Sequence, residues 1–98
     1  MAPNAGWRFS DPYLTSAIQT WQLTAGPSPE QLESFYDWCL LVVGEGPPEE
    51  SFPVPGDYER FLAVVPAAAV IVDFTTVEQD KLIFVSAIDQ FGDGSQTQ

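Results

Sequence analysis

The chain has 98 residues, of which 45% are hydrophobic and 13% aromatic, and its formal net charge is -11. That length fits one domain, and the apolar content is sufficient for a packed core, which argues against intrinsic disorder. Three basic residues stand against 14 acidic ones. Because nucleic acids and anionic membranes are bound mainly through Lys and Arg, we expect neither as a partner.

The first quarter of the chain predicts a short strand followed by a helix. Trp7, Arg8 and Phe9 alternate as in a strand. Ser10 or Asp11 can accept the capping hydrogen bonds of a helix that we expect over residues 12–22, because Pro12 suits a first helical position. The predicted apolar stripe of this helix is Tyr13, Leu14, Ala17, Ile18 and Trp21.

A second helix is predicted over residues 29–43. Ser28 is its expected cap, and Gln31 completes a capping box. Gly44 is placed to end the helix in the left-handed conformation. Residues 45–56 are rich in Pro, Gly and Glu and are expected to form a loop. The predicted inner face of the helix is Leu32, Phe35, Tyr36, Cys39 and Val43.

The remaining sequence predicts three strands, over residues 58–65, 69–75 and 82–88. Pro66 should lie in the turn after the first strand, because proline cannot donate to a central ladder, and residues 78–80 should form the next turn. The third strand is apolar at nearly every position, which favours a central place in the sheet. In the second strand, one face should carry Val70, Val72 and Phe74, and the other Ile71, Asp73 and Thr75.

The predicted order is β-α-α-β-β-β. It indicates an α+β fold in which a helical hairpin packs on one face of a small, mostly antiparallel sheet. We expect a single domain over residues 1–98, with a flexible N-terminus at residues 1–5 and a flexible tail at residues 92–98. We see no signal peptide and no apolar stretch of about 18 residues, so we expect a cytoplasmic protein.

The order of elements resembles that of the RelE/ParE toxin superfamily of bacterial toxin–antitoxin systems. The best local match is the run Ala-Val-Ile-Val-Asp-Phe at residues 69–74, then a short turn and Leu-Ile-Phe-Val-Ser-Ala-Ile at residues 82–88. The RNA-cleaving members resemble one another in basic residues on the strands and a basic or aromatic group near the C-terminus. This chain has Ala69 where an Arg is usual, and no His, Lys or Arg follows the last strand. The resemblance therefore implies a toxin-like scaffold without the ribonuclease site, which can still bind a protein as the toxins bind antitoxins.

Residue types that serve common catalytic and metal sites are scarce. The chain has no His and a single cysteine, Cys39, so the usual base of Ser and Cys triads and the common zinc ligands are missing. Cys39 lies on the predicted apolar face of the second helix, where we expect an inert thiol. Residues 89–95 resemble a fragment of a calcium loop but lack its alternating acids and closing Glu. We expect no catalytic residue, no cofactor and no metal.

Asp73 stands in an otherwise apolar strand. The simplest interpretation is a polar residue on the outward face of the strand, beside Thr75. It could also be a partner for Arg60, or a catalytic carboxylate acting with Asp57 or Glu59. A small carboxylate-dependent enzyme is therefore an alternative function.

The acidic residues are concentrated between positions 30 and 59, where no basic residue occurs. Spacings of three and four place Glu30, Glu33 and Asp37 on one face of the second helix, together with Leu41. Such a face aids solubility, and its functional interpretation is a docking surface for a basic protein. The predicted partner-binding residues are Glu30, Glu33, Asp37, Trp38, Leu41 and Glu45.

The leading hypothesis is a non-catalytic, acidic protein–protein interaction protein on a toxin-like scaffold, whose partner has a basic surface. A nucleic-acid mimic that blocks a basic nucleic-acid-binding protein is an alternative, because the charge alone permits it. One of the two uncharged segments, residues 61–65 or residues 67–72, is also predicted to pair at a sheet edge, in a homodimer or an obligate heteromer.

Overall fold

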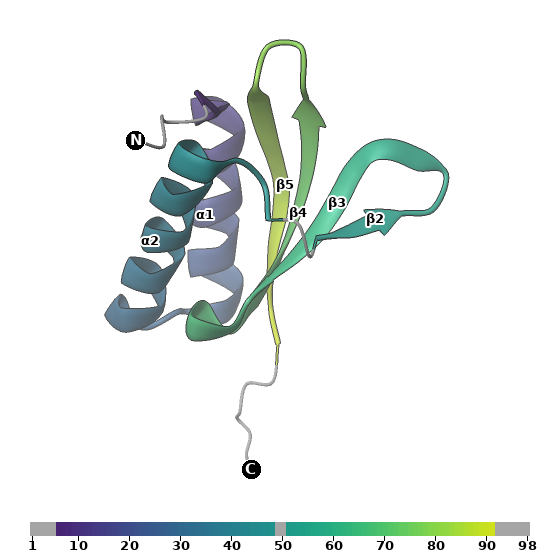
Figure 1. The fold of residues 1–98 in the computed structure, drawn as a ribbon. Helices are drawn as coiled ribbons and strands as arrows, with labels where there is room; N and C mark the ends of the chain where they lie inside the picture. Colours follow the sequence, from purple (N-terminus) through teal and green to yellow (C-terminus); the bar gives the residue numbers. More distant parts are fainter. Residues whose placement is uncertain (1–5, 49–50, 92–98) are drawn as a thin grey trace.

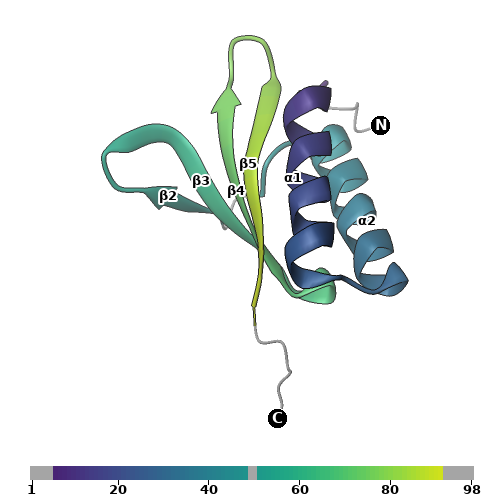
Figure 2. The ribbon, with the colours of Figure 1, turned by 180° about the vertical axis from the view of Figure 1, so that it is seen from behind.

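The computed structural model describes residues 6–48 and 51–91, so the flexible ends expected at residues 1–5 and 92–98 lie outside the described residues. Within them, both helices lie side by side on one face of a five-stranded sheet (Figures 1 and 2). The predicted α+β order is confirmed, with one additional short strand before the predicted sheet strands. The elements are β1 (Arg8–Phe9), α1 (Asp11–Ala25), α2 (Pro29–Glu45), β2 (Phe52–Val54), β3 (Asp57–Val65), the 3-10 helix η1 (Pro66–Ala68), β4 (Val70–Val77) and β5 (Leu82–Gln90).

The strands are arranged in the order β1-β5-β4-β3-β2. β1 pairs with β5 in parallel, and the other neighbours are antiparallel. The middle strand is therefore β4. β5, for which a central place was predicted, is an inner strand with β1 on one side and β4 on the other. On its outer side, within the described residues, β5 is paired only with Arg8 and Phe9.

A break in alternation also contributes to the continuous apolar character of β5. A register shift opposite Asp73 and Phe74 interrupts the alternation of its side chains. Ile83, Val85 and Ile88 are buried in the core. Phe84, between two of them, packs edge-on against Tyr13 of α1, with 5.0 Å between the ring centroids.

The capping box of α2 forms as predicted. Ser28 Oγ accepts a hydrogen bond from the Gln31 amide at 3.1 Å, and Gln31 Oε1 accepts one from the Ser28 amide at 2.9 Å. At the start of α1, Ser10 is the capping residue, but its side chain makes no capping hydrogen bond. In the part of the chain that the structure describes, no helix has the length and apolar character needed to cross a membrane.

The end of α2 lies two residues beyond the predicted one. Gly44 stays helical, and Gly46 takes the positive φ of 90°, with its amide donating to the Val42 carbonyl at 2.7 Å. A Cβ atom on Gly46 would lie 3.1 Å from Trp7 Nε1. Both the backbone conformation and the close approach of the indole therefore favour glycine at this position.

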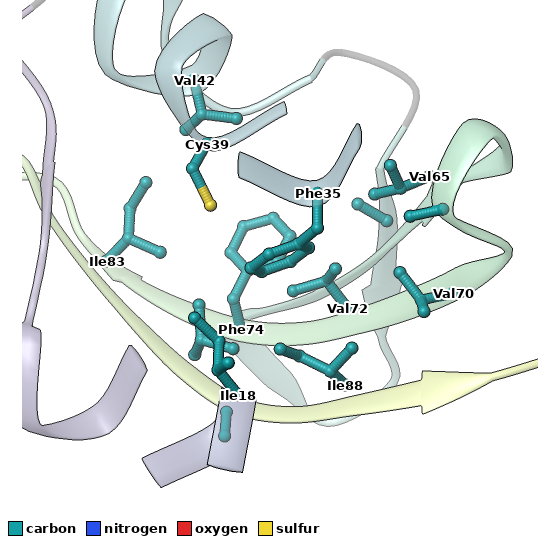
Figure 3. Close-up of a cluster of buried hydrophobic side chains, with 14 of the residues drawn as sticks. Ile18, Phe35, Cys39, Val42, Val65, Val70, Val72, Phe74, Ile83 and Ile88 are labelled. Carbon is teal, nitrogen blue, oxygen red and sulfur yellow. The ribbon is translucent and has the colours of Figure 1, made fainter. Parts of the chain in front are cut away.

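The core lies between the helices and β3, β4 and β5 (Figure 3). On α2, Phe35 and Cys39 are buried as predicted, but Val42 takes the place expected for Val43. Tyr36 is exposed to solvent, contrary to the prediction. Positions 35, 39 and 42 form one line on a helix of 3.6 residues per turn, whereas position 36 is rotated away by about 100°.

The predicted faces of residues 69–75 are confirmed in β4. Val70, Val72 and Phe74 are buried, and the intervening residues are half-buried. Of the two segments considered for pairing at an edge, residues 67–72 do not provide one, because Val70 and the residues after it belong to the central strand. β2 pairs with β3 as far as Leu62, so it does not pair with residues 63–65 of β3. Dimerisation itself stays a prediction.

Candidate interaction surface

A groove of about 450 Å³ lies between α2 and the strands β2 and β3. The β2–β3 hairpin extends away from the helices (Figure 1). We call it the α2–β3 groove. Its main lining residues are Trp38 and Leu41 from α2, Pro48 from the following loop, Phe52 from β2, Val64 from β3 and Pro66 from η1.

Three large apolar side chains around this groove are exposed to solvent. Leu41 is 53% exposed, Phe52 60% and Val64 44%. A single exposed apolar residue is ordinary on a protein surface. Several around one concave, mostly apolar groove are typical of an interaction site.

Trp38 forms the rigid wall of the groove. Its ring stacks on that of Phe35, with 5.9 Å between the ring centroids. The centroid of the Trp38 ring also lies 6.4 Å from that of Phe74 and 6.2 Å from that of Phe9. Trp38, a predicted partner-binding residue, is half-buried against the core, and its remaining surface lines the groove. Leu41, one turn further along α2, is exposed.

Two of the predicted carboxylates flank Leu41. Asp37 and Glu45 each lie four residues from it, which is about 6 Å along the helix axis. Glu33 and Glu30 lie eight and eleven residues before Leu41, about 12 and 16 Å away along the axis. All four are exposed. The structure therefore brings Asp37, Trp38, Leu41 and Glu45 together and leaves the other two acids at the far end of α2.

These four carboxylates form no ion pair within residues 6–48 and 51–91. Glu33 and Asp37 are like charges at i,i+4, and Glu45 lies at the negative end of a helix whose last turn has no basic residue. Each arrangement costs a helix a few tenths of a kcal/mol, roughly. Helix stability therefore does not account for the acids beside the groove.

The sequence did not identify Phe52 and Val64 as parts of this surface. Phe52 lies in the segment predicted to be a loop, and its one signal is a large aromatic residue among Pro, Gly and Glu. Val64 was placed correctly in a strand. The sequence pattern of that strand, however, does not indicate whether neighbouring elements cover the Val64 side chain.

Arg60 and Asp73 form a two-pronged ion pair across β3 and β4. Arg60 Nε donates to Asp73 Oδ1 at 2.9 Å, and Nη2 donates to Oδ2 at 2.6 Å. The interpretation of Asp73 as a partner for Arg60 is confirmed. Its cross-strand neighbours, Leu62 and Ala87, are apolar, so the guanidinium is the group that satisfies this carboxylate.

We expect Arg60→Met to lower the free energy of unfolding by about 1–2 kcal/mol. The side chain of Asp73 is only 13% exposed and would lose both hydrogen bonds, but Arg60 is 43% exposed, so solvent screens the pair and limits the loss. Urea denaturation measures the change. The double variant Arg60→Met/Asp73→Leu should recover most of it, because no unpaired carboxylate is left. A double variant less stable than the single one would contradict this account.

Cys39 is a free, buried thiol. Burial raises its pKa from the ordinary 9.0 to about 12, because the thiolate is poorly solvated among apolar side chains. It is therefore protonated at neutral pH and a poor nucleophile or metal ligand. Among the described residues, no group of three or more His, Cys, Asp or Glu side chains is placed to hold a metal ion.

Comparisons with known proteins assign the chain to no family. No protein-family model, no curated protein and no solved structure matches it. The resemblance to the RelE/ParE superfamily stays a prediction.

Proposed function

We propose that this protein is a non-catalytic interaction protein whose α2–β3 groove binds a basic, amphipathic segment of another protein. The observation that carries the proposal is the combination of exposed Leu41, Phe52 and Val64 around one groove with the carboxylates Asp37 and Glu45 beside it, which form no ion pair within the described residues. Apolar anchors in a groove supply most of the affinity of such contacts, and charged rims supply selectivity and rate.

The chemistry of the groove supports a basic, amphipathic occupant. An apolar side chain of the partner would lie between Trp38, Leu41 and Phe52, and Lys or Arg residues on either side would face Asp37 and Glu45. The net charge of -11 attracts a basic segment over a longer range. The apolar lining favours this proposal over a nucleic-acid mimic, because a mimic requires carboxylates where this surface has leucine, phenylalanine and valine.

A displayed library of random peptides tests the proposal, because it offers the groove apolar, basic, acidic and uncharged segments in equal competition. Selection on the unmodified protein should enrich peptides with an apolar residue flanked by Lys or Arg. Leu41→Asp should weaken binding of the selected peptides at least about tenfold, because it places a charge where the apolar anchor lies.

The matched control is Leu23→Asp, which makes the same change at a leucine that is 87% exposed on α1. It should leave the affinity within about twofold. Circular dichroism confirms that both variants stay folded. Enrichment of acidic or uncharged peptides, or equal losses in the two variants, would contradict the proposal.

A further inference from the structure

A second concave site adjoins the loop that follows α2, and its lining shares Pro48 and Ser51 with the α2–β3 groove. This cleft has a volume of about 350 Å³ and is lined by residues of β3 and β4 and by the residue before β1. We call it the Trp7 cleft. Its apolar lining includes Trp7, Pro47 and Phe61, and its polar lining includes Glu59, Thr76 and Glu78.

The apolar walls of the Trp7 cleft are fixed in place by the core. Trp7 is itself a buried core residue. Phe61 stacks on Phe74 of the core, with 5.8 Å between the ring centroids. Because neither ring can turn away freely, the cleft is preformed and does not need a ligand to assemble it.

Thr76 places a hydroxyl-bearing side chain in the lining of the cleft. It is only 9% exposed, and it is the single buried polar residue among those described. It follows Val72 and Phe74 on the buried face of β4. No fully buried side-chain nitrogen or oxygen among the described residues lacks a hydrogen-bond partner. The Thr76 hydroxyl makes no hydrogen bond within them, so it still reaches solvent at the cleft that Thr76 lines. The hydroxyl is therefore available to a polar group that enters the cleft.

The mouth of the cleft carries negative charge. Glu59 and Glu78 are exposed, and neither forms an ion pair within the described part of the chain. The ammonium of Lys81, in the turn that follows Glu78, already lies 5.7 Å from the centroid of the Trp7 ring. An aromatic ring beside carboxylates attracts cations through its quadrupole as well as through the charges.

We propose that the Trp7 cleft binds an alkylguanidinium or alkylammonium group. Its alkyl stem would lie against Trp7, Phe61 and Pro47, and its N–H groups would donate to the Thr76 hydroxyl and to Glu59 and Glu78. The proposal does not depend on the α2–β3 groove, since it concerns a different cavity and a ligand that needs no peptide. The group has two possible sources, a free small amine or guanidine and the side chain of Lys or Arg in a protein.

Titration of the full chain with n-butylguanidinium tests the proposal, with n-butanol as the uncharged counterpart. The readout is the indole N–H resonance of Trp7, assigned by its loss in Trp7→Phe. We expect a saturable shift with n-butylguanidinium and little shift with n-butanol. N-acetyl-arginine methylamide distinguishes the sources, because binding by it shows that the cleft accepts a side chain within a peptide. Its failure to bind, with n-butylguanidinium still bound, assigns the cleft to a free small cation.

Matched variants separate a specific site from general attraction to an acidic protein. Glu59→Gln/Glu78→Gln should weaken n-butylguanidinium binding about fivefold or more, and Thr76→Val about threefold. Glu30→Gln/Glu33→Gln removes the same charge at the start of α2 and should leave the affinity within about twofold. Equal effects of the two Gln pairs, equal binding of n-butanol, or the absence of saturation would each overturn the proposal.

Discussion

Replacing Phe35 with alanine is expected to lower the free energy of unfolding by about 3–5 kcal/mol. Phe35 is fully buried on α2 and lies in the middle of the core (Figure 3). The centroid of its ring lies 5.6 Å from that of Trp21 on α1 and 5.9 Å from that of Trp38. Its removal leaves a cavity between both helices and the sheet, which these large rings cannot refill without leaving their own positions.

Urea denaturation followed by circular dichroism measures this loss. Since small domains are stable by only about 5–15 kcal/mol, the variant should be marginally folded or unfolded at 25 °C. Leu23→Ala, at the exposed leucine of α1, is the control and should change stability by less than about 0.5 kcal/mol. A Phe35→Ala variant that loses less than about 1 kcal/mol would show that the core is packed differently.

The stability of the protein should fall at alkaline pH because of Cys39. The thiol has a pKa of about 12 in the folded protein against an ordinary 9.0. The unfolded chain therefore releases this proton first, and the stabilisation present below pH 9 is lost between pH 9 and pH 12. Between pH 7.5 and 10.5 the loss due to Cys39 should be about 2 kcal/mol.

The variant Cys39→Ala isolates this contribution, because the other titrating groups of the chain are unchanged. Both proteins are denatured with urea at pH 7.5 and at pH 10.5. The change in the free energy of unfolding between the two pH values is determined for each protein, and the two changes are compared. The variant should lose about 2 kcal/mol less than the unmodified protein over this interval. If the free energy of unfolding falls equally in the two proteins between pH 7.5 and pH 10.5, the account of a buried thiol with a raised pKa is contradicted.

Local sequence signals predicted the helices and the three long strands. The capping box at Ser28 and Gln31 is local chemistry, and it forms as expected. The alternation along β4 assigned both of its faces correctly. The end of α2 was missed by two residues, because Gly44 and Gly46 are both plausible stops and the contact of Gly46 with Trp7 is not visible in the local sequence.

The candidate site was predicted only in part, because it depends on how distant elements meet. The acidic face of α2 follows from helical spacing, and Leu41 was correctly placed on it. The sequence placed Trp38 beside that face but did not decide how far it is covered, because the contacts with Phe9 and Phe74 that hold it half-buried come from other elements. β2 was missed because it is three residues long and contains a proline, so its pattern differs little from that of a loop. Without β2, Phe52 could not be placed beside α2.

The most direct test of the proposed function is a map of the surface that a selected basic peptide contacts. Amide resonances of the 15N-labelled protein are followed while the peptide is added. The largest shifts should occur at Leu41, Phe52 and Val64, with none at Leu23 or at Asp73 in its ion pair with Arg60. Shifts centred on Asp73, on α1 or spread evenly over the acidic surface would show that the α2–β3 groove is not the binding site.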